Sequence, residues 1–82
     1  MAIPLYGFVA GDSLGVLVLV EDNDTIAELA HRLQQAAQVR VAPRRRVQVT
    51  VNGKFLERDA TVKESGLVAL DRVDLAPLED AP

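Results

Sequence analysis

The sequence predicts an α+β fold in which a single helix packs across one face of a mixed β-sheet. Short apolar runs with the composition of strands occur both before and after one amphipathic segment near the middle of the chain. An Asn-Gly pair joins two of these runs, which is the strongest short-range signal of a hairpin. Because the chain has only 82 residues, it forms one domain, and its long helix can be buried only against a sheet.

The first two strands are predicted at residues 3–9 and 14–20. Both segments are apolar, and the second is rich in β-branched residues. The residues between them, Ala-Gly-Asp-Ser, have the chemistry of a turn. Two such runs around a turn that contains glycine predict a β-hairpin.

The helix is predicted to start after Thr25. Thr25 and Glu28 form a capping-box pattern, in which each side chain can accept a hydrogen bond from the other residue's backbone N–H. Apolar residues then follow at helical spacing: Ile26, Leu29, Ala30, Leu33 and Ala37. They form one apolar stripe, and the helix should end near Ala37 or Gln38.

The second half of the chain supplies the remaining strands. Residues 47–51 alternate between apolar and polar types, which predicts a strand with one buried face, and Asn52-Gly53 leads into a short return strand at residues 54–56. Alternation returns at residues 72–75, and Pro77 should stop this last strand.

A second capping-box pattern lies between these strands. Thr61 and Glu64 predict a very short helix that Gly66 ends in a left-handed conformation, with Leu67 as an apolar anchor. The element order is therefore β-β-α-β-β-short helix-β, which is the β-grasp plan. We assign residues 1–76 to this domain and expect residues 77–82 to form a flexible C-terminal tail.

The composition excludes several classes of protein. The chain has no cysteine, so disulfides, thiolate catalysis and cysteine metal sites are excluded. Its N-terminal residues lack the basic region of a signal peptide, and the longest apolar run, residues 16–20, is far too short to cross a bilayer. We therefore expect a cytoplasmic protein that does not contact a membrane.

No pattern of residues indicates catalysis. His31 is the only histidine, and no two further ligands stand at suitable spacing for a metal site. Asp22 and Asp24 precede the helix, where carboxylates stay ionised as capping charges. Neither Ser13 nor Ser65 has a histidine partner for a catalytic triad. We therefore expect no catalytic, cofactor-binding or metal-binding residue in this chain.

Two stretches of the chain are similar to ubiquitin. Residues 21–29, Glu-Asp-Asn-Asp-Thr-Ile-Ala-Glu-Leu, resemble its strand-to-helix junction, and residues 52–56, Asn-Gly-Lys-Phe-Leu, resemble its glycine-lysine turn. The resemblance implies a ubiquitin-like fold. Ubiquitin-type conjugation is not expected, because that chemistry uses a C-terminal Gly-Gly and this sequence ends in Ala81-Pro82.

A narrower resemblance is to the small gamma subunit, or system protein B, of the toluene 4-monooxygenase and toluene/o-xylene monooxygenase hydroxylases. It rests on residues 41–44, Val-Ala-Pro-Arg, and on Arg58-Asp59 leading into residues 64–67, Glu-Ser-Gly-Leu. Shorter matches lie at residues 23–26 and 73–75.

This resemblance implies a non-catalytic accessory subunit of a bacterial multicomponent diiron monooxygenase for aromatic hydrocarbons. The diiron centre would lie in the large (alpha) subunit, which this chain would bind, and this chain would hold no cofactor. The wider system would contain a beta subunit, an NADH-dependent reductase, a Rieske ferredoxin and an effector protein. The alternative is a ubiquitin-like accessory protein of a bacterial specialised secretion system, and neighbouring genes would separate the two.

The second strand suggests where a partner binds. If the valines of residues 16–20 face the helix, Leu17 and Leu19 point away from the core on what should be an edge strand. Such an edge is an aggregation liability unless something covers it. We therefore predict a partner-binding patch of Leu17 and Leu19 with Tyr6 and Phe8. The alternative, that a curled N-terminus or a loop covers this strand, stays open.

The same alternation places Gln48, Thr50, Arg72 and Asp74 on the outer face, so receptors that grip this part of ubiquitin are not expected to bind. A second candidate surface consists of arginines that could pair with acids on the large subunit: Arg40, Arg44, Arg45 and Arg46. Nucleic acid is not an expected partner, because the net charge is −3 and no aromatic stacking platform accompanies the arginines.

Overall fold

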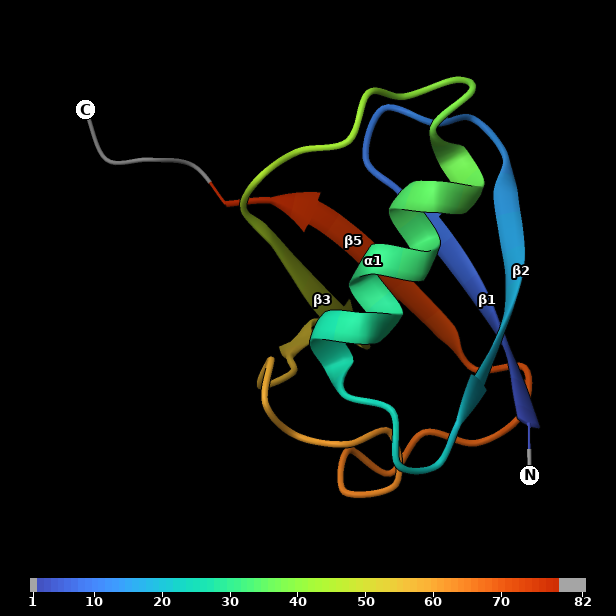
Figure 1. Ribbon diagram of the computed structural model, residues 1–82, viewed down its shortest axis with the longest axis vertical. Coiled ribbons are helices and arrows are strands. Elements are labelled where there is room, and N and C mark those ends of the chain that lie inside the picture. The colour runs from blue at the N-terminus through green and yellow to red at the C-terminus, as the bar shows by residue number, and fades with distance from the viewer. Residues whose placement is uncertain (1, 79–82) are drawn as a thin grey trace.

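The computed structural model describes residues 2–78, which form a five-stranded mixed sheet crossed by one helix (Figure 1). The elements are β1 (Ala2–Val9), β2 (Gly15–Glu21), α1 (Ile26–Ala37), β3 (Val47–Val51), β4 (Lys54–Phe55) and β5 (Arg72–Pro77). The strand order is β2-β1-β5-β3-β4, in which β1 and β5 are parallel and the other neighbours are antiparallel. The predicted α+β fold with a β-grasp order is confirmed.

The start of α1 follows from its capping box. The Glu28 N–H donates to Thr25 Oγ1 at 3.1 Å, and the Thr25 N–H donates to Glu28 Oε1 at 3.5 Å. These bonds satisfy backbone donors that have no partner inside the helix. The helix ends at Ala37 with Gln38 as its C-cap, as predicted.

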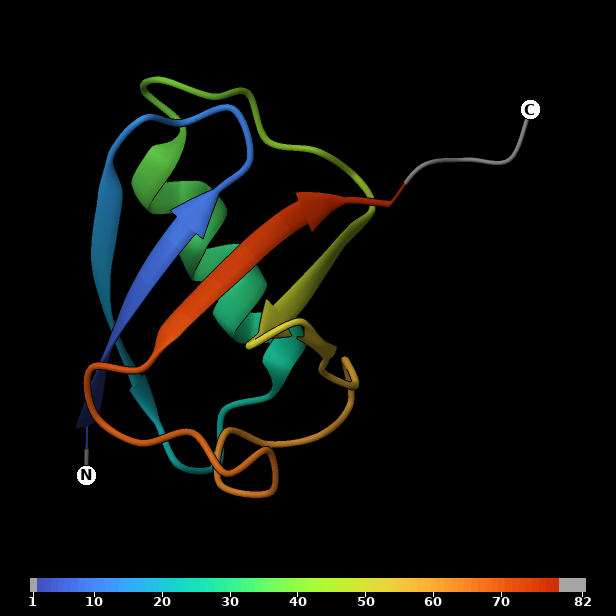
Figure 2. The ribbon, with the colours of Figure 1, turned by 180° about the vertical axis from the view of Figure 1, so that it is seen from behind.

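The hydrophobic core lies between α1 and one face of the sheet. The predicted helix stripe is buried, and alternate residues of the strands meet it, including Leu5, Val20, Val49 and Val73. Full burial of each such side chain contributes about 1.5–3 kcal/mol. Figure 2, viewed from behind, shows the opposite face of the sheet, which no helix covers.

Gly7 allows the helix to approach β1 closely. A Cβ atom at this position would overlap Cδ2 of Leu33, a fully buried side chain of α1. The absence of a side chain at Gly7 thus leaves space for Leu33 to pack against β1 in the core.

The β3–β4 hairpin forms at the predicted turn. Asn52 and Gly53 adopt φ angles of 53° and 78°, as the two central residues of a type I′ turn require. The return strand is shorter than predicted, since only Lys54 and Phe55 belong to β4, but the Leu56 N–H still donates to the Val49 carbonyl at 2.9 Å.

The predicted short helix at Thr61 is corrected to a single turn. The capping box forms, with the Glu64 N–H on Thr61 Oγ1 and the Thr61 N–H on Glu64 Oε1. One helical hydrogen bond follows, from the Ser65 N–H to the Thr61 carbonyl. The left-handed Gly66, with a φ of 75°, then reverses the chain before a second turn can form, and Leu67 anchors it in the core.

The last strand extends through Pro77, which lies opposite Val47 of β3. The strand ends at this residue, as predicted, and Pro77 fits there because β1 pairs with β5 only as far as Leu75, so no β1 residue needs the N–H that proline lacks. The Leu78 N–H also bonds to the Arg46 carbonyl at 2.9 Å. The rest of the predicted tail, residues 79–82, lies outside the described residues.

Candidate partner-binding surfaces

The outer face of the β1–β2 hairpin carries the side chains that the sequence analysis proposed for partner binding. β2 is an edge strand, as predicted, and Leu17 and Leu19 are 58% and 57% exposed. In the strand register Leu17 lies opposite Tyr6, and Leu19 lies opposite Pro4. We call these residues the apolar patch: Pro4, Tyr6, Phe8, Leu17 and Leu19.

An aromatic pair and a cation organise one end of the apolar patch. The rings of Tyr6 and Phe8 stack with their centroids 6.3 Å apart and an interplanar angle of 20°. The Arg72 guanidinium carbon lies 4.2 Å from the Phe8 ring centroid, a cation–π geometry, and this arginine also pairs with Asp74 at 3.1 Å. These contacts therefore hold the aromatic side chains in place on the outer face of the sheet.

Gln48, Thr50, Arg72 and Asp74 make the outer face of the central strands largely polar, as predicted. Asp74 of β5 lies opposite Thr50 of β3, Gln48 lies opposite Ala76, and Arg72 lies beside Tyr6 of β1. Apolar area on this face therefore lies on β1 and β2 and, at the other edge, on Phe55 of β4, which pairs with Thr50 and is 65% exposed. Within residues 2–78, no loop covers Leu17 or Leu19, and both are more than half exposed.

Leu70 is a surface residue that the sequence analysis missed. It is 62% exposed, and its N–H donates to the carbonyl of Pro4, which places its backbone beside the apolar patch. Its φ angle is 68°, a left-handed conformation that is costly for a residue with a branched side chain. No turn signal such as Gly or Asn marks this position in the sequence.

The four predicted arginines do not form one cluster. Arg40 makes a two-pronged ion pair with Asp12, with Nε 2.9 Å from Oδ1 and Nη2 2.9 Å from Oδ2. The Asp12 side chain is only 1% exposed. This bond from Arg40 holds the pKa of the Asp12 carboxyl below its usual value, and Asp12 in turn raises the pKa of Arg40. Arg40 therefore fastens the end of α1 to the β1–β2 turn.

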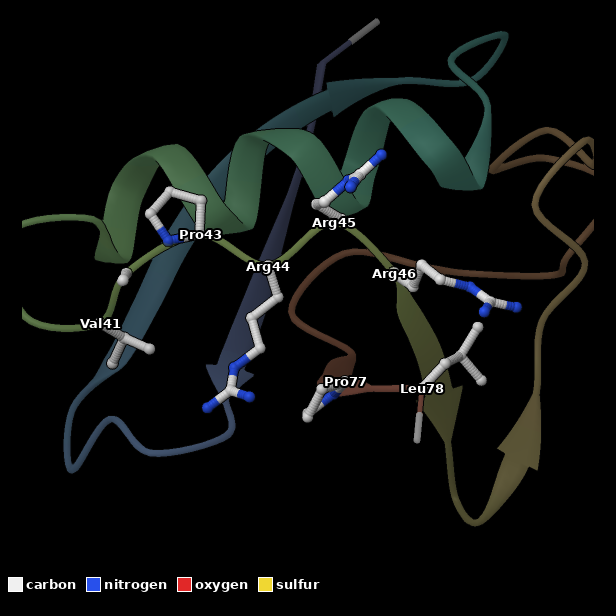
Figure 3. A pocket seen from close by; sticks show the side chains of 8 residues that line it. Val41, Pro43, Arg44, Arg45, Arg46, Pro77 and Leu78 are labelled. Carbon is white, nitrogen blue, oxygen red and sulfur yellow. The ribbon is translucent and has the colours of Figure 1, made fainter. Parts of the chain in front are cut away.

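The other three arginines, Arg44 to Arg46, lie on an extended segment that a side chain of α1 holds in place. The Gln34 amide accepts from the Arg44 N–H at 2.6 Å and donates to the Arg44 carbonyl at 3.1 Å. The segment borders an open groove of about 670 Å³ that Pro77 and Leu78 close on the other side (Figure 3). Arg44 and Arg45 point to opposite sides of the segment in this view.

Residues 2–78 contain no group of three or more His, Cys, Asp or Glu side chains that could hold a metal ion. His31 is exposed on α1. Asp24 accepts from the Glu21 N–H at 2.8 Å and lies 3.8 Å from Arg32, so it stabilises the turn before the helix.

Within residues 2–78, no helix has the length and apolarity needed to span a membrane.

Comparison with protein families gives one match. The model of toluene-4-monooxygenase system protein B (TmoB) matches residues 2–76. None of the curated proteins matches the sequence significantly.

Solved structures give two levels of similarity. A chain of the toluene 4-monooxygenase HD complex with the inhibitor 4-bromobenzoate has a TM-score of 0.88 and 29% identity, over 95% of this chain and 100% of that chain. Caldiarchaeum subterraneum ubiquitin has a TM-score of 0.75 and 16% identity, over 100% of both chains. The ubiquitin-like domain of Plasmodium falciparum Dsk2 has a TM-score of 0.74 and 19% identity, over 95% of this chain and 100% of that chain. The last two confirm the ubiquitin-like fold.

Proposed function

This chain belongs to the toluene-4-monooxygenase system protein B family, and we propose from this premise that it is a non-catalytic accessory subunit of a bacterial multicomponent diiron monooxygenase. The observation that supports the proposal best is the match of residues 2–76 to that family. The similarity to a whole chain of the toluene 4-monooxygenase HD complex supports it further.

We propose that the subunit binds the large hydroxylase subunit through its apolar patch. Leu17 and Leu19 lie on an edge strand and expose more than half of their surface, next to the stacked Tyr6 and Phe8 rings. Exposed apolar area on a sheet edge is a liability for an isolated domain, and burial against a partner removes it. A hydroxylase surface that is apolar at its centre would fit this patch.

In this proposal the chemistry belongs to the partner. The resemblance assigns the diiron centre to the large subunit and the supply of electrons to an NADH-dependent reductase and a Rieske ferredoxin. This chain would contribute surface and stability to the hydroxylase, and no ligand to the metal.

Affinity purification tests the proposed function. The tagged chain is expressed in its native cell, and the eluate is studied by mass spectrometry and iron analysis, with an untagged extract as the control. We expect a large iron-containing hydroxylase subunit to co-elute. Recovery of the chain alone, or together with components of a membrane secretion system, would contradict the proposal.

A further inference from the structure

A second surface lies on the helix side of the sheet, between α1 and β3. It is a groove of about 220 Å³, with apolar atoms of Ala27 and Val47 among its lining. His31, Arg45 and Arg58 also line it, and Arg44 lines it as well, although its side chain points to the other side of its segment from Arg45 (Figure 3). No acidic residue lines it. The groove therefore combines an apolar floor with a positive rim.

Three separate segments bring these cations together. His31 stands on the exposed side of α1, and Arg45 follows Arg44, whose backbone the Gln34 amide holds against the helix. Arg58 comes from the segment after β4, and its carbonyl accepts from the Ala27 N–H at 3.1 Å. His31 thus belongs to α1, and hydrogen bonds from α1 hold the segments that carry Arg45 and Arg58 beside it.

The arginines of the groove have no acidic partner of their own. The side chains of Arg44, Arg45 and Arg58 form no ion pair with any of residues 2–78. Arg32, Arg40 and Arg72, in contrast, pair with Asp24, Asp12 and Asp74. The chain as a whole carries a net charge of −3, so the charge of this groove is opposite in sign to that of the whole protein. Like charges gathered without counter-charges favour an anionic ligand.

We propose that this groove binds an acidic segment of a protein. One apolar side chain of the segment would occupy the floor beside Ala27 and Val47, and flanking carboxylates would pair with Arg45 and Arg58 and accept a hydrogen bond from His31. A nucleic acid is disfavoured as the occupant, since no aromatic side chain lines the groove to stack with bases. The groove lies on the side of the sheet opposite to the apolar patch, so the proposal is independent of the proposed subunit contact.

Fluorescence anisotropy with a labelled synthetic peptide tests the proposal. The probe is an eight-residue peptide of Asp and Glu with one central Leu, and its control replaces the acids with Asn and Gln. We expect the acidic peptide to bind and its affinity to fall as salt is raised, because exposed charge pairs are screened. The full chain is used, and circular dichroism confirms that each variant is folded.

Two matched double variants separate the groove from bulk charge. Arg45→Glu with Arg58→Glu should weaken peptide binding by about tenfold, since two exposed pairs become repulsive. Lys54→Glu with Lys63→Glu makes the same charge change at exposed sites outside the groove, and it should leave the affinity within about twofold.

Several results would overturn the proposal. Equal losses in the two double variants, absence of binding, or equal binding of the amide peptide would show that the groove does not select acids. Preferential binding of a single-stranded oligonucleotide would assign it to nucleic acid. Strong peptide binding that appears only after removal of residues 79–82 would assign it to the chain's own end, and dimers in sedimentation at the same concentration would assign it to a second copy.

Discussion

Leu17 of β2 lies directly opposite Tyr6 of β1, and both side chains project from the sheet face that α1 leaves uncovered. A leucine and an aromatic ring at paired positions form a continuous apolar surface, because opposite residues on one face are close neighbours. In an isolated domain this contact protects only part of each side chain, since 58% of Leu17 and 47% of Tyr6 stay exposed. The proposed docking of the large subunit would bury the part of this pair that the domain leaves exposed.

The first prediction is that the apolar patch contributes little to folding. Replacement of Leu17 and Leu19 by Ser should change the free energy of unfolding by less than about 1 kcal/mol, because both side chains face solvent. Urea denaturation followed by circular dichroism measures this. The buried Leu5→Ala variant is the control and should lose about 2–5 kcal/mol. Unfolding of the Leu17/Leu19 double variant would mean that these side chains belong to the core.

The sequence predicts the local parts of the fold better than the long-range contacts. The capping box at Thr25 and Glu28 and the turn at Asn52-Gly53 are encoded within four residues, and both formed as predicted. The second capping box also formed, but its helix did not, because Gly66 comes too soon. Local patterns indicate where an element starts more reliably than how far it extends.

Contacts between distant residues could not be predicted from one sequence. The Arg40–Asp12 pair joins residues 28 positions apart. Because of this pair, Arg40 stabilises the fold and does not join the other three arginines in the expected patch. That His31 and Arg58 line the same groove depends on how the loop after β4 returns to α1. The left-handed conformation of Leu70 could not be predicted, because no local sequence signal marks a leucine with a positive φ angle. The alternation of β2 did predict the outward position of Leu17 and Leu19, since a strand repeats every two residues.

A second prediction concerns Gly7. Gly7→Ala should destabilise the domain by about 1–3 kcal/mol, because the new methyl group overlaps the Leu33 side chain. Thermal denaturation measures the loss. In a Leu33→Ala background the same substitution should cost much less, because the overlap is removed. An equal cost in both backgrounds would show that strand propensity, and not this contact, determines the effect.

A third prediction concerns Leu70. Leu70→Gly should stabilise the isolated domain by about 0.5–1 kcal/mol, because the left-handed conformation costs a leucine about 1–2 kcal/mol and part of this gain is offset by the flexibility of glycine when unfolded. Val68→Gly is the matched control, since this exposed residue of the same loop does not have a positive φ, and it should stabilise nothing. A loss of stability in Leu70→Gly would mean that its side chain makes contacts that outweigh the strain.

A fourth prediction is a loss of stability in acid that depends on Asp12. Hydrogen bonds from Arg40, and then from the Leu14 N–H, lower the pKa of the folded Asp12 carboxyl. The folded state therefore binds this proton less readily than the unfolded chain. The ionised Asp12 carboxylate therefore stabilises the folded state above the unfolded pKa of about 4. This stabilisation is lost as the pH falls through the lower pKa of the folded state.

The variant Asp12→Asn isolates this effect. Its melting temperature should lie below that of the wild type at neutral pH, and the difference should disappear towards about pH 2. Glu64, whose pKa is lowered by hydrogen bonds from Thr61, is present in both proteins and so cancels in the comparison. A difference that does not change with pH would exclude an ionised Asp12 as its source.

The most direct test of the central claim is affinity purification of three tagged forms from the same cells, with iron in the eluate as the readout. The forms are the wild type, the Leu17→Ser/Leu19→Ser double variant, and Leu14→Ser, which changes an exposed leucine in the turn before β2. The wild type and Leu14→Ser should retain the iron-containing hydroxylase, and the double variant should retain about tenfold less, as expected for the loss of two central interface leucines. Equal amounts of iron with all three forms would contradict the apolar patch as the docking surface, and no iron with the wild type would contradict the assignment as a hydroxylase subunit.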